Sequence, residues 1–195
     1  MTGIKLIAIA GLIVALGAPI AVHAQDEGGD GGLGWDLYAG VEFDMTTVDL
    51  SDDGLQEQFG RGRFESDFYK LRLGARLFEA VGVELHAGFP AHDADGREIE
   101  TKQFYGLYFV PTGVIAELFE VSVRLGYAFS SVENELASED LDGASYGLSV
   151  EFPLRRAFGD SMPDLRLGFG GTVYQEERDA RIYGFHGGLR YDFSI

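Results

Sequence analysis

The residues whose types could support hydrolytic chemistry are a histidine, two serines and a carboxylate. His186 could act as a general base toward Ser145 or Ser149, which would make the serine hydroxyl a nucleophile. Glu151 is the carboxylate that could meet them across the interior. All four lie where apolar and polar residues alternate, and the apolar positions offer no polar group to hold a substrate headgroup. The sequence therefore does not favour an enzyme.

Metal and thiol chemistry are also disfavoured. His86 and His92 have no partner at a spacing typical of metal ligands, and the chain has no cysteine. We expect His86 to be a donor inside the fold and His92 to be a loop residue. Neither a metal nor a cofactor is predicted, and no disulfide can stabilise the chain.

The elements that would position these residues are β-strands. Eight segments alternate apolar and polar residues with the period of two that is typical of strands. They are WDLYAGVEFDM (35–45), YKLRLGARL (69–77), VELHAGF (83–89), YGLYF (105–109), FEVSVRLGYAF (119–129), YGLSVEF (146–152), LRLGFGGTV (165–173) and YGFHGGLRYDFSI (183–195). The only helical turn expected is a connector at residues 114–118. The pattern predicts an all-β fold with an even number of strands.

Glycine and charge indicate which face of these strands points inward. Most strand glycines lie on the polar positions, together with seven charges of each sign that include Asp36 and Lys102. Small residues gather where space is short, and the polar face is short of space in a narrow membrane barrel but not in a soluble sandwich. Enclosed charges need partners, so we predict a structural charge network in the lumen. Its members are Glu42, Asp44, Lys70, Arg72, Arg76, Glu84, Glu120, Arg124, Glu151, Arg166, Arg190 and Asp192.

Four segments carry a family resemblance. WDLYAGVEFD, YGLYFVP, VRLGYAF and the closing GLRYDFSI are similar to the small outer-membrane β-barrel family that includes OmpA transmembrane domains, OmpX and opacity-type proteins. The resemblance covers nearly all of the chain after residue 24. It implies an eight-stranded antiparallel up-and-down transmembrane β-barrel. The alternating end Tyr191, Phe193, Ile195 resembles the C-terminal signal that the barrel-assembly machinery reads, although that signal usually ends in Phe. We expect this last strand to pair with the first one near Trp35 and so leave no open edge.

The N-terminus is typical of an exported protein. Lys5, an apolar run and a small-x-small site ending at Ala24 predict a signal peptide at residues 1–24. An acidic, Gly-rich linker is predicted at 25–33 and the barrel at 34–195. The location implied is the outer membrane of a Gram-negative cell, reached through the secretory pathway. A real N-terminal anchor helix is the alternative for the first segment.

The long connections predict a charged outer surface. Acidic residues outnumber basic ones in segments 49–66, 90–101, 131–143 and 175–181, whereas the opposite end has the shorter turns 79–82 and 112–118 and the longer turn 153–164. Long loops of such barrels face outward, where lipopolysaccharide is the neighbour. Asp93 with Asp95, and Glu139 with Asp140 and Asp142, could bind divalent cations weakly, but loop hydration is the simpler role. The acidic chain, with formal net charge −17, does not favour nucleic acid as a partner.

The predicted function is a structural and interaction scaffold that displays acidic loops. The alternative is a low-conductance channel for ions or small solutes, since a lumen lined by charge could be wet. Side chains nearly fill the interior of an eight-stranded barrel, which disfavours a general diffusion porin. A lipid A modifying barrel enzyme, a soluble lipocalin-like barrel and an open sheet with solvated charges remain as less favoured alternatives.

Overall fold

The computed structural model describes residues 35–60, 62–78, 80–91, 100–115, 118–133, 138–159, 161–176 and 180–193. The predicted signal peptide (1–24), the linker (25–33), His92, the pair Asp93 and Asp95, and the terminal Ile195 lie outside these residues. Among the described residues, no helix has the length and apolar character needed to cross a membrane.

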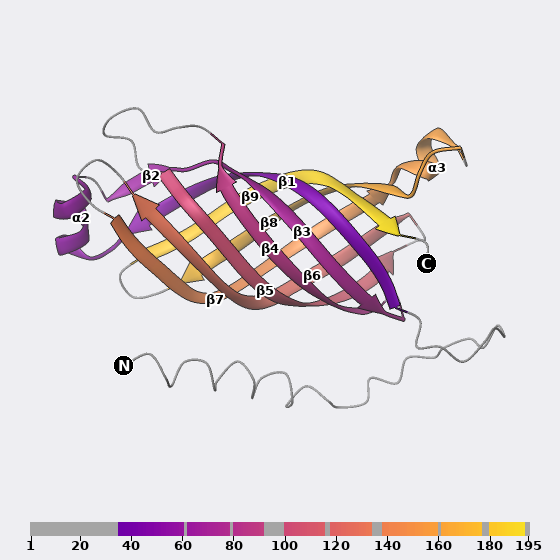
Figure 1. Ribbon diagram of the computed structural model, residues 1–195, viewed down its shortest axis with the longest axis horizontal. Helices are drawn as coiled ribbons and strands as arrows, with labels where there is room; N and C mark the ends of the chain where they lie inside the picture. The colour runs from indigo at the N-terminus through magenta and orange to yellow at the C-terminus, as the bar shows by residue number, and fades with distance from the viewer. Residues whose placement is uncertain are drawn as a thin grey trace. The chain divides into compact units, whose positions relative to one another are not determined.

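Eight long strands form one closed antiparallel barrel (Figure 1). They are β1 (Trp35–Leu50), β3 (Phe68–Leu77), β4 (Val81–Pro90), β5 (Glu100–Ile115), β6 (Phe119–Glu133), β7 (Ser138–Pro153), β8 (Leu165–Glu176) and β9 (Ala180–Phe193). Each pairs with the next, and β9 pairs with β1 from Leu37 opposite Phe193 to Leu50 opposite Ala180. The predicted all-β up-and-down barrel, including its closure by the last strand, is confirmed.

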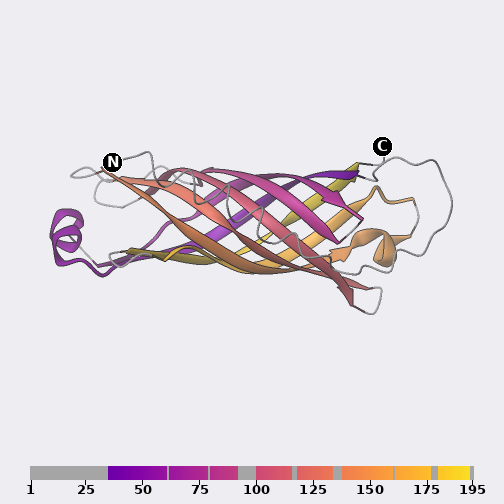
Figure 2. The same cartoon turned by 90° about the horizontal axis from the view of Figure 1, so that it is seen from below.

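Three short elements were not expected from the sequence. Segment 49–66 contains the helix α2 (Asp53–Phe59) and the strand β2 (Arg63–Glu65), and turn 153–164 contains the helix α3 (Leu154–Phe158). The Asp52 carboxylate caps α2 by accepting a hydrogen bond from Leu55 N at 3.0 Å, and Gly60 ends it in the left-handed conformation with φ 76°. β2 extends the sheet along the outer part of β1. The two helices lie at opposite ends of the barrel, which we call the α2 end and the α3 end (Figure 2).

Several expected connections are partly strand. The predicted helical turn at 114–118 is wrong for Val114 and Ile115, because β5 continues through them. The predicted loop 131–143 is also mostly strand, since β6 runs to Glu133 and β7 begins at Ser138. These extensions keep the alternation of buried and exposed positions, so the β6–β7 hairpin is the direct continuation of the barrel wall.

The apolar phase of the strands faces outward. Val41, Leu73 and Leu85 are 55%, 60% and 58% exposed, whereas their neighbours Arg72 and Glu84 are each 2% exposed. Lys102 is an exception to the predicted phase. A bulge between Thr101 and Gln103 turns its side chain to the exterior, while Thr101 stays buried inside.

The barrel interior has two layers. At the α2 end it is filled by an apolar cap, which consists of Val48, Leu50, Phe59, Phe64, Phe68, Phe104, Ala128, Val132, Leu141, Tyr174, Ala180 and Ile182. The rings of Phe68, Phe104 and Tyr174 pack together with centroids 4.9 to 5.6 Å apart. Phe59 of α2 belongs to this cap and is buried in it. The interior between this cap and the α3 end is charged.

Candidate functional site

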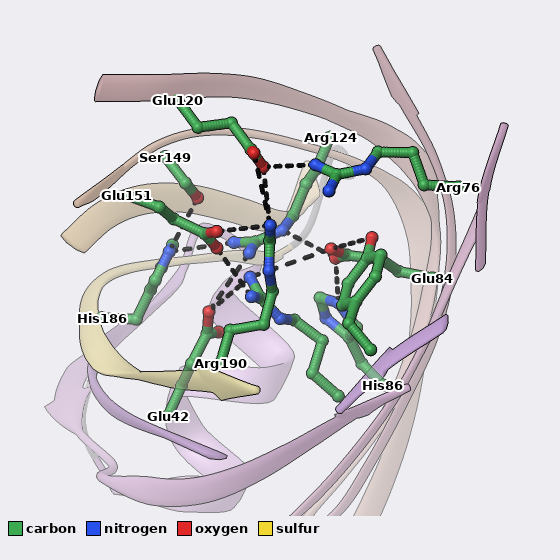
Figure 3. A network of polar contacts seen from close by, with 12 residues as sticks. Glu42, Arg76, Glu84, His86, Glu120, Arg124, Ser149, Glu151, His186 and Arg190 are labelled. Carbon is green, nitrogen blue, oxygen red and sulfur yellow. Dashed lines mark hydrogen bonds and ion pairs between the residues drawn. The ribbon is translucent and has the colours of Figure 1, made fainter. Parts of the chain in front are cut away.

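The charged layer is built from inward-pointing side chains of the strands (Figure 3). Period-two alternation puts every second residue in the lumen, and strand tilt brings residues of non-adjacent strands into contact there. The twelve predicted members of the network all lie in described strands, and each forms at least one ion pair. Six are acidic and six are basic, so the layer is balanced.

Arg72 of β3 lies at the centre of the network. Its Nη1 is 2.9 Å from Glu42 Oε1 and 3.8 Å from Glu84 Oε1, and its Nη2 is 2.6 Å from Glu151 Oε1. These three carboxylates belong to β1, β4 and β7. One guanidinium therefore joins four strands.

Arg124 of β6 makes a second set of links. Its Nε donates to Glu84 Oε2 at 3.0 Å and its Nη2 donates to Glu42 Oε1 at 3.1 Å. Its Nη1 donates to His186 Nε2 at 2.9 Å, because a guanidinium can only donate. Arg124 is fully buried, and its charge is paired with the carboxylates of Glu42 and Glu84.

Lys70 connects the charged layer to the apolar cap. Its Nζ is 2.8 Å from Glu42 Oε2 and 3.1 Å from Asp44 Oδ2. It also donates to the Tyr174 hydroxyl at 2.8 Å, and that hydroxyl donates to Asp44. Tyr174 thus has its ring in the cap and its oxygen in the network.

At the α3 end the network becomes accessible to solvent. Arg190 pairs with Glu120 at 2.7 Å and with Glu151, and Arg76 Nη1 lies 2.8 Å from Glu120 Oε1. Two further members form the rim. Arg166 Nε is 2.7 Å from Asp192 Oδ2, with side chains 25% and 19% exposed.

The tyrosines of the interior were not predicted from the sequence. The Tyr38 ring lies 4.7 Å from the Arg190 guanidinium and 5.8 Å from those of Arg72 and Arg76, and its hydroxyl donates to Glu84 at 2.8 Å. Stacked arginines gain cation–π attraction beside their ion pairs. The signal was present, because Tyr38 falls on the polar phase of its strand.

Of the four residues considered for hydrolysis, only Ser149 and His186 are in contact. Ser149 donates to His186 Nε2 at 3.1 Å, and Asp44 lies 3.9 Å from His186 Nδ1. Ser145 instead contacts the Tyr108 hydroxyl and donates to Val173 O, both at 3.0 Å. Glu151, the fourth residue, pairs with arginines.

Ser149 and His186 have the geometry of a nucleophile and base but not the access. A base must have a free nitrogen lone pair, and Arg124 already donates to Nε2. Both residues are buried between the apolar cap and the ion pairs. The arrangement is suited to holding the wall together.

The histidine and loop carboxylates considered for metal binding do not gather. His86 Nε2 contacts Glu84 Oε2 at 2.7 Å, and its ring packs on Tyr108. Asp140 and Asp142 lie on β7, where Asp142 accepts a hydrogen bond from the Tyr127 hydroxyl. Across the described ranges, no group of three or more His, Cys, Asp or Glu side chains is placed to hold a metal ion.

The fold matches solved outer-membrane barrels. The crystal structure of Ail, the attachment invasion locus protein of Yersinia pestis, in complex with the heparin analogue sucrose octasulfate, is 12% identical, with a TM-score of 0.55 over 82% of this chain and 99% of that one. A second Ail crystal structure is 13% identical, with a TM-score of 0.53 over 81% and 98%. Neisserial surface protein A is 14% identical, with a TM-score of 0.48 over 82% and 99%.

No protein-family model and no curated protein sequence matches the chain. The likeness to Ail shows the fold, and the predicted resemblance to the small outer-membrane barrels is confirmed at that level.

Proposed function

We propose that the chain is an integral outer-membrane protein whose barrel is a structural and interaction scaffold rather than an enzyme or a pore. The observation that carries this proposal is the inverted barrel: its exterior is apolar and its interior is filled by paired charges and a cap. A soluble barrel would need the opposite arrangement.

The exterior supports a membrane location. The shorter strands β3 and β4 each have 10 residues, which suits a tilted strand that crosses the hydrocarbon core. Exposed aromatic residues lie toward both ends of the apolar belt, as in interfacial girdles. Trp35, Phe119, Tyr191 and Phe193 are on the α3 side, and Tyr69, Phe89, Phe129 and Tyr146 are on the α2 side.

The filled interior argues against the channel alternative. Phe68, Phe104 and Tyr174 fill the lumen within the cap. Arg72 spans the lumen on the α3 side of the cap. Ions would have to separate several buried pairs to pass. We expect no resolved conductance from the refolded protein in planar bilayers, and stable single-channel steps would revive the alternative.

The α2 end is the surface proposed for interaction. Long connections face outward in such barrels, so this end would meet lipopolysaccharide. It presents Asp49, Asp52, Asp53, Glu57, Glu133, Glu139, Asp140, Asp142 and Glu176. Export through the secretory pathway and insertion by the barrel-assembly machinery belong to the same proposal.

Outer-membrane fractionation followed by electrophoresis tests the proposal. The expected result is recovery in the detergent-dependent outer-membrane fraction and a mobility that changes on boiling, because a closed barrel resists cold detergent. A protein that stays soluble without detergent and runs identically before and after boiling would refute it.

A further inference from the structure

The β7–β8 turn carries a large apolar side chain that is mostly exposed. No residue of α3 is buried, and Phe158 is 68% exposed. One exposed phenyl group is ordinary on a protein surface. Its position is not ordinary, because α3 projects from the side of the barrel wall at the α3 end (Figure 1).

The turn has a defined shape. Arg155 Nη1 lies 2.7 Å from Asp164 Oδ1, and its Nε donates to Met162 O at 3.0 Å. Gly159 N donates to Arg155 O at 2.8 Å, which closes the helical turn. Phe158 is therefore presented by an internally bonded turn rather than left on an extended strand.

The apolar belt of the barrel reaches the start of this turn. Phe152, near the end of β7, packs on Phe119 of β6 with ring centroids 5.8 Å apart. Only Pro153 separates Phe152 from α3. On that helix Leu154 and Phe158 are four residues apart and share a face, with Arg155 beside them.

We propose that this turn is a membrane-surface anchor whose partner is the phospholipid bilayer on the α3 side. Phe158 inserts at the boundary of headgroups and acyl chains, and the exposed guanidinium groups of Arg155 and Arg156 lie at the level of the lipid phosphates. The inference rests on the outer-membrane location proposed above. It assigns the turn a role beyond connecting two strands.

Tryptophan fluorescence in lipid vesicles tests this anchor. The chain has one tryptophan, so Trp35→Phe gives a silent background. In that background three variants are compared, Phe158→Trp in the turn, Leu125→Trp on the barrel wall and Ser138→Trp at the α2 end. Each is refolded into phosphatidylcholine and phosphatidylglycerol vesicles that carry lipids brominated at a shallow or a deep chain position.

The expected result is a blue-shifted Phe158→Trp emission, quenched more strongly by shallow than by deep bromines. The Ser138→Trp emission should stay water-like and respond to aqueous iodide. If Leu125→Trp is quenched by deep bromines while Phe158→Trp behaves like Ser138→Trp, the anchor is refuted and the membrane barrel stands. If Leu125→Trp is not quenched either, the proposed membrane location itself fails.

Discussion

Arg72 and Glu151 form an ion pair across the full width of the barrel, with Nη2 2.6 Å from Oε1. Their strands, β3 and β7, are four positions apart in a ring of eight, so they face each other. Arg124 and Glu42 join β6 and β1 in the same way at 3.1 Å. The wall is thus held by side-chain links through its centre as well as by backbone hydrogen bonds between neighbours.

Removing one partner of the Arg72–Glu151 pair should cost more than removing both. Arg72→Met leaves buried carboxylates without their cation, and we expect a loss of about 3–5 kcal/mol. Adding Glu151→Leu should restore part of this stability. Urea unfolding in lipid vesicles measures the cycle. The exposed pair Arg155–Asp164 is the control, with an expected coupling of about 0–1 kcal/mol. Additive losses at Arg72 and Glu151 would mean that the two residues are solvated independently.

A charge on the outward face should be penalised by lipid. Leu125→Arg places a guanidinium on the apolar belt, where the expected cost is about 2–4 kcal/mol, and Leu167→Arg should behave similarly. Ser138→Arg, at the exposed start of β7, is the matched control and should be close to neutral. Vesicle unfolding compares them. Equal tolerance at Leu125 and Ser138 would contradict the assigned faces.

Gly74 should be intolerant of even one methyl group. A Cβ there would overlap the ring of Tyr38, which is held by Glu84 and by stacked arginines. We expect Gly74→Ala to cost about 1–3 kcal/mol as an overpacked site, whereas Gly113→Ala, with open space around it, should not destabilise. Adding Tyr38→Leu to Gly74→Ala should recover part of the loss. No recovery would assign the effect to the backbone instead.

Calcium should not stabilise the α2 end specifically. Asp142 is already engaged by the Tyr127 hydroxyl, and the described carboxylates form no cluster of three. Thermal unfolding in millimolar calcium should match that in sodium at equal ionic strength. A calcium-specific rise that Asp140→Asn with Asp142→Asn abolishes would show instead that the loops are bridged.

Ser149 should be unreactive in the folded barrel. Its hydroxyl and the Arg124 guanidinium share one nitrogen of His186, and both Ser149 and His186 are buried. A fluorophosphonate probe should therefore leave the folded protein unlabelled, as it should a Ser149→Ala variant. Labelling that Ser149→Ala removes would reopen the enzyme hypothesis.

Period-two alternation predicted the eight strands, and glycine and charge predicted the inward phase of residues such as Arg72. The closed barrel was implied by the family resemblance. The prediction failed where inward and outward residues are both apolar, and where a bulge changes which residues point inward. Val48 and Leu50 point inward although apolar, so polarity alone could not reveal the cap. The bulge at Lys102 depends on pairing between strands, which a single segment does not encode. The partners of each charge likewise depend on strand tilt and stagger, which no local pattern contains.

Because an apolar cap lies on the charged layer, the interior is closed at the α2 end and meets solvent at the α3 end. Within the described charge network, Arg166 and Asp192 at the α3 end have side chains 25% and 19% exposed, whereas the side chains of Lys70 and Asp44, next to the apolar cap, are fully buried. With the α2 end outward, as proposed above, this geometry would shield the interior charges from the external medium and leave them in contact with the periplasmic side. A sudden change of salt or acidity outside the cell would then reach the acidic surface but not the ion pairs that hold the wall together.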